Sequence, residues 1–469
     1  MSRIFCAIVA CLLPVILTSC APASTPASIS PATRTPLPTA TITVTPEPTI
    51  TFTPEPTATP VTFIEGLNNV PQPNNDFINR VVNGNYLKVM GLLRDQVELV
   101  YVEHTGIDGQ QFVVMLDSTT GVPLAVYADE WEKSTLGFWG KQVGIEIGTD
   151  AYFASPSSDE MKLILSFGRA TFGVGGNWKG IEPRQNEYNM GELKSQEKAY
   201  NALIRNGVND IIIHAAIFPG DLPDWLHSNT FSQDELREIM KKRIQFLIDK
   251  NPHATFLVVV NEPYQADNPG RKDPFYDAWG GYEYIVEAFQ IAKAYSESQN
   301  RDIKLIYNDS DNHYAIGSTS NISRQIVRML HEKGLIDYVG MQTHIGEWRE
   351  RAFDELMIPQ MPQEIEFYKQ LGVPVLITEL SYQPDSNSVL SDYKMTISQD
   401  EFERNLSHVY EAVFRIAIES GNVHGVTFWG LTDKYYKLDN VNWYGIFDEY
   451  GQPKQSYYIV LRTLYEGMK

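Results

Sequence analysis

Two glutamates follow similar apolar runs, and their side chains could serve as acid, base or nucleophile. Glu262 follows the run at residues 255–260, and Glu379 follows the run at residues 373–378. Such runs of β-branched and aliphatic residues are typical of strands buried on both faces of a parallel sheet. A single carboxylate at a strand end could simply pair with a lysine or arginine. Two in matching positions indicate an active site, because parallel α/β barrels place catalytic groups at the carboxyl ends of their strands.

A pair of carboxylates suits the hydrolysis of a glycosidic bond better than other reactions. In the retaining form of this chemistry, two carboxyl groups about 5–5.5 Å apart flank the bond. One is the nucleophile, and the other is first the acid and then the base. We therefore expect Glu262 and Glu379 to act together on a glycoside.

The segments that would position these glutamates alternate between strand-like and helical patterns from about residue 130. The strand-like runs are residues 143–148, 170–174, 210–216, 255–260, 303–307, 338–342, 373–378 and 425–429. Amphipathic segments between them include residues 190–205, 232–250, 282–299, 320–333 and 400–420. Eight such units predict an α/β fold, a (β/α)8 TIM barrel, over residues 130–469. A doubly wound open sheet is the alternative.

The first sixty residues have the composition of a targeting segment and a spacer. An apolar run follows Arg3 and ends in Leu17-Thr18-Ser19-Cys20, which resembles a bacterial lipobox. We expect residues 1–20 to be a lipoprotein signal peptide, with Cys20 lipidated on the extracellular side of a bacterial membrane. An ordinary signal peptide and secretion are the alternative. Residues 21–62, nearly all Pro, Thr, Ala and Ser, predict a disordered tether.

A small β-rich module is expected between the tether and the barrel, over residues 63–129. Strand-like alternation occurs at residues 96–102, 112–116 and 123–127, and glycines lie where hairpin turns would be. Nothing in these residues indicates what the module does.

Composition excludes some classes of partner. The formal net charge of −20 argues against nucleic acid, because a phosphate backbone requires a basic surface. A neutral polysaccharide carries no such penalty. The three cysteines, Cys6, Cys11 and Cys20, all lie in the first twenty residues, so the rest of the chain has no disulfide and no thiolate metal site. We expect a monomer that meets the membrane only through its lipid anchor.

From about residue 137 to the C-terminus, the sequence resembles the xylanases of glycoside hydrolase family 10. Matching segments occur in the family's order: Trp178, Glu182-Pro183, Val259-Val260-Asn261-Glu262, Gly340-Met341-Gln342-Thr343-His344, Ile377-Thr378-Glu379-Leu380 and Thr427-Phe428-Trp429-Gly430. The resemblance implies a retaining hydrolase of β-1,4-linked xylan. It also implies that hydrolysis needs no cofactor and no metal.

The resemblance assigns a role to each matching residue. Glu262 would be the acid/base and Glu379 the nucleophile. Asn261 would hydrogen-bond the sugar 2-hydroxyl, and His344 and Gln342 would support the pocket. The remaining implied site residues are Trp429 under the −1 sugar, Trp178 near the glycone side and Asn308 beside Glu262. Tyr264, Tyr435, Trp443 and Tyr444 are further candidates for aromatic contacts in the cleft.

Departures from the family pattern concern the residues that would hold sugar hydroxyls. Gly173, Val174 and Asn177 replace a Glu-Asn pair and a Lys, and Lys437 replaces a tryptophan. On this alignment Pro219 stands where a histidine of the −1 subsite is expected, and His214 matches an earlier, structural histidine. One alternative is therefore the same mechanism on another β-glycan or on decorated xylan. The other is a non-catalytic, polysaccharide-binding lipoprotein.

Overall fold

A computed structural model describes the chain from residue 99 to residue 468 with gaps. The described ranges are 99–105, 111–117, 123–127, 135–151, 158–263, 273–315, 317–347, 358–384, 399–434, 445–451 and 453–468. Cys20, the tether and residues 63–98 lie outside the described residues. Strands β1 (Leu99–Thr105), β2 (Gln111–Asp117) and β3 (Pro123–Tyr127) form an antiparallel sheet, where strand-like alternation was expected. The extent of the predicted module stays a prediction.

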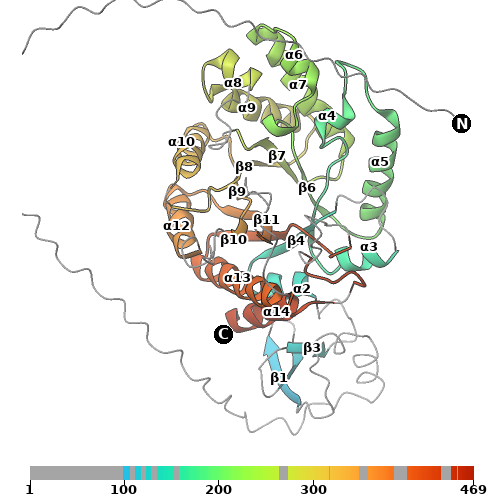
Figure 1. The fold of residues 1–469 in the computed structure, drawn as a ribbon, viewed down its shortest axis with the longest axis vertical. Helices are drawn as coiled ribbons and strands as arrows, with labels where there is room; N and C mark the ends of the chain where they lie inside the picture. The colour runs from blue at the N-terminus through green and yellow to red at the C-terminus, as the bar shows by residue number, and fades with distance from the viewer. Residues whose placement is uncertain are drawn as a thin grey trace, which may run out of the picture. The chain divides into compact units, whose positions relative to one another are not determined.

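The rest of the described chain forms a closed barrel of eight parallel strand positions, which confirms the predicted TIM barrel (Figure 1). The strands are β4 (Glu146–Asp150), β5 (Arg169–Thr171), β6 (Asp210–Ile213), β7 (Phe256–Asn261), β8 (Lys304–Asp309), β9 (Tyr338–Met341), β10 (His344–Glu347), β11 (Val375–Pro384) and β12 (Val423–Phe428). Consecutive strands pair in parallel, and the pairing of β12 with β4 closes the ring. Strands β9 and β10 both pair with β11 and together occupy one position in the wall.

Helices surround this ring and cover its outer face (Figure 1). They are α2 (Leu136–Gln142), α3 (Ser158–Ile164), α4 (Trp178–Ile181), α5 (Met190–Arg205), α6 (Asp224–Ser228), α7 (Gln233–Lys250), α8 (Pro274–Trp279), α9 (Glu283–Ser298), α10 (Ser318–Glu332), α12 (Met361–Leu371), α13 (Gln399–Ser420) and α14 (Gln455–Gly467), with short 3₁₀ turns at Pro219–Asp221 and Ile358–Gln360. Ser232 and Glu235 form a capping box at the start of α7, so two otherwise unpaired backbone N–H groups are satisfied there.

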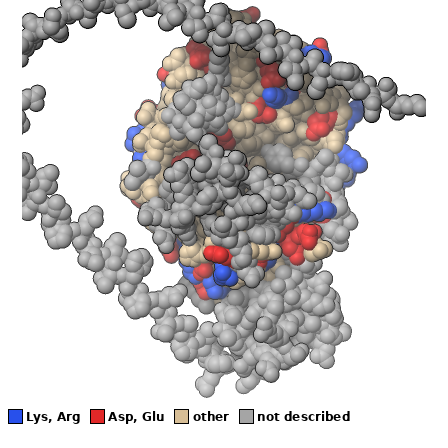
Figure 2. All heavy atoms as spheres, viewed as in Figure 1, with Lys and Arg blue, Asp and Glu red and all other residues tan. Residues whose placement is uncertain are grey.

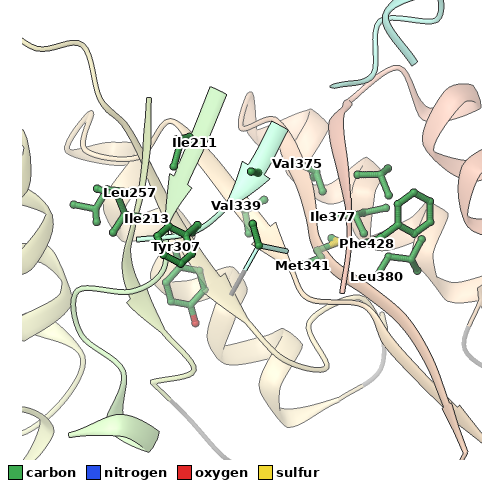
Figure 3. Packing of buried hydrophobic residues seen from close by; sticks show 14 of the residues in the cluster. Ile211, Ile213, Leu257, Tyr307, Val339, Met341, Val375, Ile377, Leu380 and Phe428 are labelled. Atoms are coloured by element: carbon green, nitrogen blue, oxygen red, sulfur yellow. The ribbon is translucent and has the colours of Figure 1, made fainter. Parts of the chain in front are cut away.

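The strands are apolar on both faces, as predicted from their sequences. Side chains at alternate positions, such as Ile211, Ile213 and Leu257, pack with the surrounding helices in the main core (Figure 3). The residues between them form a second, smaller cluster: Ile212, Ala215, Phe256, Val258, Ile306 and Leu376. Because neighbouring residues of a strand point to opposite faces, this smaller cluster fills the interior of the barrel.

Strand β11 differs from its prediction in length. We expected the strand to end at residue 378, before Glu379, but it continues to Pro384 and pairs there with β10. Its pairing with β12 shifts register between Ile377 and Leu380. Such an irregularity re-aims the side chains within it, and Glu379 lies at this point.

The surface is mixed in charge. On the face in Figure 2, acidic and basic side chains of the described residues lie interspersed. Within the described part of the chain, no helix combines the length and the apolar character needed to cross a membrane.

Candidate active site

The predicted site residues that the structure describes gather at the carboxyl ends of the barrel strands. Asn261 is the last residue of β7, Glu262 follows it, and Asn308 is the penultimate residue of β8. Gln342 lies between β9 and β10, and His344 begins β10. Glu379 lies at the irregularity of β11, and Trp429 follows β12. Tyr264, Tyr435, Lys437, Trp443 and Tyr444 lie outside the described residues.

Glu379 is buried and surrounded by polar side chains. Asn308 Nδ2 donates to its Oε1 at 2.9 Å, and His214 Nε2 lies 3.3 Å from the same oxygen. His344 Nε2 lies 3.3 Å from Oε2. Burial alone would raise the pKa of Glu379, but the hydrogen bonds and charge of His214 and His344 outweigh it and hold the pKa well below the ordinary value. The ionised form of Glu379 is therefore favoured.

The two histidines contact Glu379 in different ways. Burial lowers the pKa of His214, but the hydrogen bond to Glu379 and its charge outweigh this and raise the pKa above the ordinary value. His344 uses both ring nitrogens, since its Nδ1 lies 2.7 Å from Ser381 Oγ. The ring of His344 is therefore held from both sides.

Glu262 is half-buried and contacts two side-chain amides. Gln342 Nε2 donates to its Oε1 at 2.7 Å, and Asn261 Nδ2 lies 3.4 Å from the same oxygen. Its backbone has a φ of +45°, a region that costs a non-glycine residue energy and is found most often at functional sites. Its N–H donates to the carbonyl of Asn308 at 3.0 Å, which holds the strained turn in place.

A network of amides connects the two glutamates. Asn308 Nδ2 donates both to Glu379 Oε1 and to Asn261 Oδ1, the latter at 2.7 Å. Gln342 Nε2 reaches Asn261 Oδ1 at 3.3 Å as well as Glu262. The hydrogen bonds of these amides therefore link both carboxyl groups.

The two tryptophans expected in the site occupy different environments. Trp429 is partly buried, and its ring lies 5.9 Å from the ring of His214, beside Glu379. Trp178 is 2% exposed, packs edge-on against Trp225, and lies under the guanidinium of Arg243. Its Nε1 donates to Glu182 Oε2 at 2.9 Å. Trp178 is thus a core residue with no face exposed for a sugar.

The segment that departs from the family pattern packs directly on β6. A Cβ atom at Gly176 would lie 2.2 Å from the carbonyl oxygen of His214, so only glycine fits there. Arg243, whose pKa burial lowers to about 9, donates to the carbonyls of Gly175 and Gly176 at 2.7 and 2.8 Å. Asn177 Oδ1 accepts the N–H of Gly180 and caps α4. The segment uses these polar groups to hold itself in place.

The sequence alignment matched His214 to a structural histidine. In the structure its Nε2 lies 3.3 Å from Glu379 Oε1 and its ring 5.9 Å from the ring of Trp429, so it supports the carboxyl group directly. The position was visible in the sequence, since His214 directly follows β6 at the end of the barrel that holds the glutamates. The alignment places the expected histidine of the −1 subsite at Pro219, five residues after His214. Pro219 itself begins a 3₁₀ turn and is buried.

The arrangement joins two carboxyl groups in different environments through one hydrogen-bonded network. Glu379 is buried and its pKa is depressed, whereas Glu262 is half-buried. Among the described residues, no group of three or more His, Cys, Asp or Glu side chains could hold a metal ion.

Comparison with known proteins identifies the family. The model of "Glycosyl hydrolase family 10" matches residues 139–463. Endo-1,4-beta-xylanase B of Thermotoga neapolitana is 27% identical over 358 residues, which cover 74% of this chain and 93% of that protein. Endo-1,4-beta-xylanase A of Caldicellulosiruptor saccharolyticus is 26% identical over 307 residues, covering 61% of this chain and 83% of that protein.

Solved structures show the same fold. Xylanase 10B from Thermotoga petrophila, in complex with xylobiose, aligns with a TM-score of 0.60 at 24% identity, covering 71% of this chain and 98% of that one. An endo-1,4-beta-xylanase from Caldicellulosiruptor owensensis aligns with a TM-score of 0.59 at 25% identity, covering 70% and 99%. With the family match over most of the barrel, these findings confirm the resemblance seen in the sequence. The chain belongs to glycosyl hydrolase family 10, and it is a glycoside hydrolase.

Proposed function

We propose that this protein is a retaining endo-1,4-β-xylanase in which Glu379 is the nucleophile and Glu262 the acid/base. The observation that carries the proposal is the contrast between the two carboxyl groups within one hydrogen-bonded network. Glu379 is buried and held ionised by His214, His344 and Asn308. Glu262 is half-buried and linked to Glu379 through the side-chain amides of Gln342, Asn261 and Asn308. The xylanase names of the relatives support xylan as the substrate.

In the first step, an oxygen of Glu379 attacks the anomeric carbon of the −1 sugar. The bond from that carbon to the leaving oxygen breaks, and the leaving oxygen takes the proton of Glu262. The products are a covalent glycosyl ester on Glu379, an ionised Glu262 and a shortened chain with a free hydroxyl.

In the second step, Glu262 removes a proton from water while the water oxygen attacks the anomeric carbon. The ester bond breaks, Glu379 leaves as a carboxylate, and the sugar is released with its original anomeric configuration. Both residues return to their starting protonation states.

The remaining residues support these steps in the proposal. Asn261 Oδ1 already accepts from Asn308 and Gln342, so its Nδ2 is the group turned toward Glu262 and toward a sugar 2-hydroxyl. His344 and Asn308 hold Glu379, and Gln342 orients Glu262. Trp429 supplies an apolar surface under the −1 sugar. We assign Trp178 to the support of this region and not to sugar contact, because it is buried.

A second candidate keeps the mechanism and changes the substrate to another β-glycan or a decorated xylan. The observation in its favour is the 173–177 segment, whose glycines and Asn177 are committed to internal packing and capping. These residues contribute no long side chain that could grip a sugar hydroxyl.

The test is hydrolysis of a panel of β-1,4-xylans, decorated xylans and other β-glycans by the purified protein, with product size and linkage read by chromatography. We expect short xylo-oligosaccharides from xylan and no products from a Glu379→Ala variant. Cleavage of another glycan in a Glu379-dependent manner would support the second candidate. Binding without cleavage of any glycan would contradict both and favour the polysaccharide-binding alternative.

We also propose that the enzyme is held on the outer side of a bacterial membrane by a lipid on Cys20. The lipobox-like segment before Cys20 and the Pro/Thr-rich residues after it support this placement. In a bacterial host, the wild type should fractionate with membranes and a Cys20→Ala variant should not. Equal release of both proteins into the medium would support the ordinary signal peptide instead.

A further inference from the structure

Asn308 contacts both glutamates, Glu379 through its side-chain amide and Glu262 through its backbone carbonyl. Its Nδ2 donates to Glu379 Oε1 and to Asn261 Oδ1 at 2.9 and 2.7 Å. Its backbone carbonyl accepts the N–H of Glu262 at 3.0 Å. Asn308 is fully buried, so water cannot replace any of these partners.

These contacts require the Asn308 amide to face one way. Its two N–H donors point at two acceptors, Glu379 and Asn261. If the amide were turned over, its own oxygen would face both of these oxygens, and two hydrogen bonds would be lost. The carbonyl oxygen of the amide must therefore be satisfied on the opposite side, because a buried acceptor without a donor is costly.

Thr378 supplies that donor. Its hydroxyl donates to Asn308 Oδ1 at 2.6 Å, and Thr378 is itself 4% exposed. Thr378 directly precedes Glu379 at the irregularity of β11, so one short stretch of chain carries both the carboxylate and the group that orients its amide partner.

Gly340 completes this arrangement from β9. A Cβ atom built on Gly340 would lie 2.2 Å from Asn308 Oδ1 and 3.1 Å from Thr378 Cγ2. Any larger residue at position 340 would push the amide oxygen away from the threonine. The space for the amide and the donor that fixes it thus come from two neighbouring strands, which pair in parallel at Gly340 and Leu376.

We propose that Thr378 is a positioning residue for catalysis: its hydroxyl fixes the Asn308 amide so that an N–H donor always faces Glu379. The inference rests on the proposed function and adds a residue to it. This orientation is needed both when Glu379 attacks and when its ester is hydrolysed. The ester has lost the negative charge that attracts the amide N–H, and Thr378 still holds the amide in the orientation needed when the carboxylate reforms.

The test compares variants of the full-length protein. Thr378→Val removes the hydroxyl and keeps the shape, and Thr378→Ser keeps the hydroxyl. Thr171→Val is the matched control, since Thr171 is also a buried strand threonine and its hydroxyl has no hydrogen-bond partner among the described residues. Should Thr378→Val fail to fold, Thr378→Ala takes its place. Thermal unfolding confirms that each variant is folded.

The readouts are kcat on xylan and the rate of inactivation by a 2,4-dinitrophenyl 2-deoxy-2-fluoro-β-xylobioside. This reagent measures attack by Glu379, because its carboxylate displaces dinitrophenolate and forms a slowly hydrolysed ester. We expect Thr378→Val to lower both rates by about tenfold, the effect of weakening one hydrogen bond to a charged group. Thr378→Ser and Thr171→Val should stay within about twofold of the wild type.

A double-mutant cycle separates positioning from a general structural effect. If Thr378 acts through Asn308, then Thr378→Val should cause no further loss of kcat in an Asn308→Ala background. Multiplicative losses, or Thr378→Ser as impaired as Thr378→Val, would overturn the inference while leaving the proposed function intact. A wild type inactive on every β-glycan and unreactive toward the reagent would overturn the proposed function, and this inference with it.

Discussion

The two glutamates occupy opposite kinds of environment within one site. Glu379 is 4% exposed, and three side chains from three other strand ends lie on its two oxygens. Glu262 is half-buried, has a backbone with positive φ, and accepts a short hydrogen bond from Gln342. The histidine partners of Glu379 hold its pKa low, whereas Glu262 is partly open to solvent.

In the proposed mechanism, this difference suits two chemically identical residues to separate roles. A nucleophile needs a constant charge and a fixed direction, and buried donors provide both. An acid/base must gain and lose a proton in each cycle, so it needs contact with substrate and solvent. Asn308, Asn261 and Gln342 are neutral amides, and they connect the two groups by hydrogen bonds.

Removal of either carboxylate should cause the largest loss of activity. Glu379→Ala should lower kcat on every substrate on the order of 10⁴-fold or more, because no other group can form the covalent intermediate. Glu262→Ala should lower kcat on xylan comparably but largely spare glycosylation by aryl xylosides with good leaving groups, since these need no proton. Pre-steady-state rates on xylan and on a dinitrophenyl xyloside measure both. Equal sensitivity of the two variants to the leaving group would contradict the assignment.

Asn308→Ala should cause the next largest loss. It removes a donor to Glu379 and a support of Asn261 together, so we expect kcat/KM to fall by about 10²–10³-fold. The loss should appear on xylan and on aryl substrates alike, because Glu379 is affected directly. A loss confined to xylan would mean that Asn308 acts on Glu262 alone.

The two tryptophans test the difference between core and cleft. Trp178→Phe should lower the free energy of unfolding by about 2 kcal/mol, through lost packing and the lost hydrogen bond to Glu182, with little change in KM. Trp429→Phe should raise KM or lower kcat with a smaller effect on unfolding. Chemical denaturation and steady-state kinetics of both variants make the comparison. A large increase in KM for Trp178→Phe would indicate that Trp178 contributes to sugar binding and would contradict its assignment to the core.

His214→Gln should produce the smallest change, a shift in pH dependence. The folded-state pKa of Glu379 is depressed in part by His214, so removing the imidazole raises that pKa. Less Glu379 is then ionised at low pH, and the acidic limb of kcat/KM moves to higher pH by about one unit. His424→Gln, at an exposed residue of β12, is the control and should leave the profile unchanged. A shift toward lower pH would contradict the assigned direction.

The barrel could be predicted from the sequence because the patterns of its strands and helices are local and repeated. Burial of both faces of strands such as β6, β7 and β8 produced the apolar runs, and α5 has the bounds expected from its periodicity. The sequence predicts the structure less well where contacts between strands that are distant in the chain decide where a strand ends. The continuation of β11 past Glu379 depends on pairing with β10, which no local pattern reveals.

The site was predicted less completely than the fold for a related reason. Strand-end position predicted Glu262 and Glu379, the family resemblance added Asn261, Asn308, Gln342 and His344, and the structure places these residues together. The contact of His214 with Glu379 joins β6 to β11, so no local pattern reveals it. Trp178 was expected near the glycone side, and the structure packs it against Arg243 and Trp225 from segments further along the chain.

The most direct test of the account is to trap the covalent intermediate and locate it. The purified wild type would be incubated with a 2,4-dinitrophenyl 2-deoxy-2-fluoro-β-xylobioside, digested, and the labelled peptide sequenced by mass spectrometry. The account predicts a single glycosyl ester on Glu379 and a burst of dinitrophenolate equal to the amount of enzyme. A label on Glu262, or turnover of xylan without any trapped ester, would contradict it.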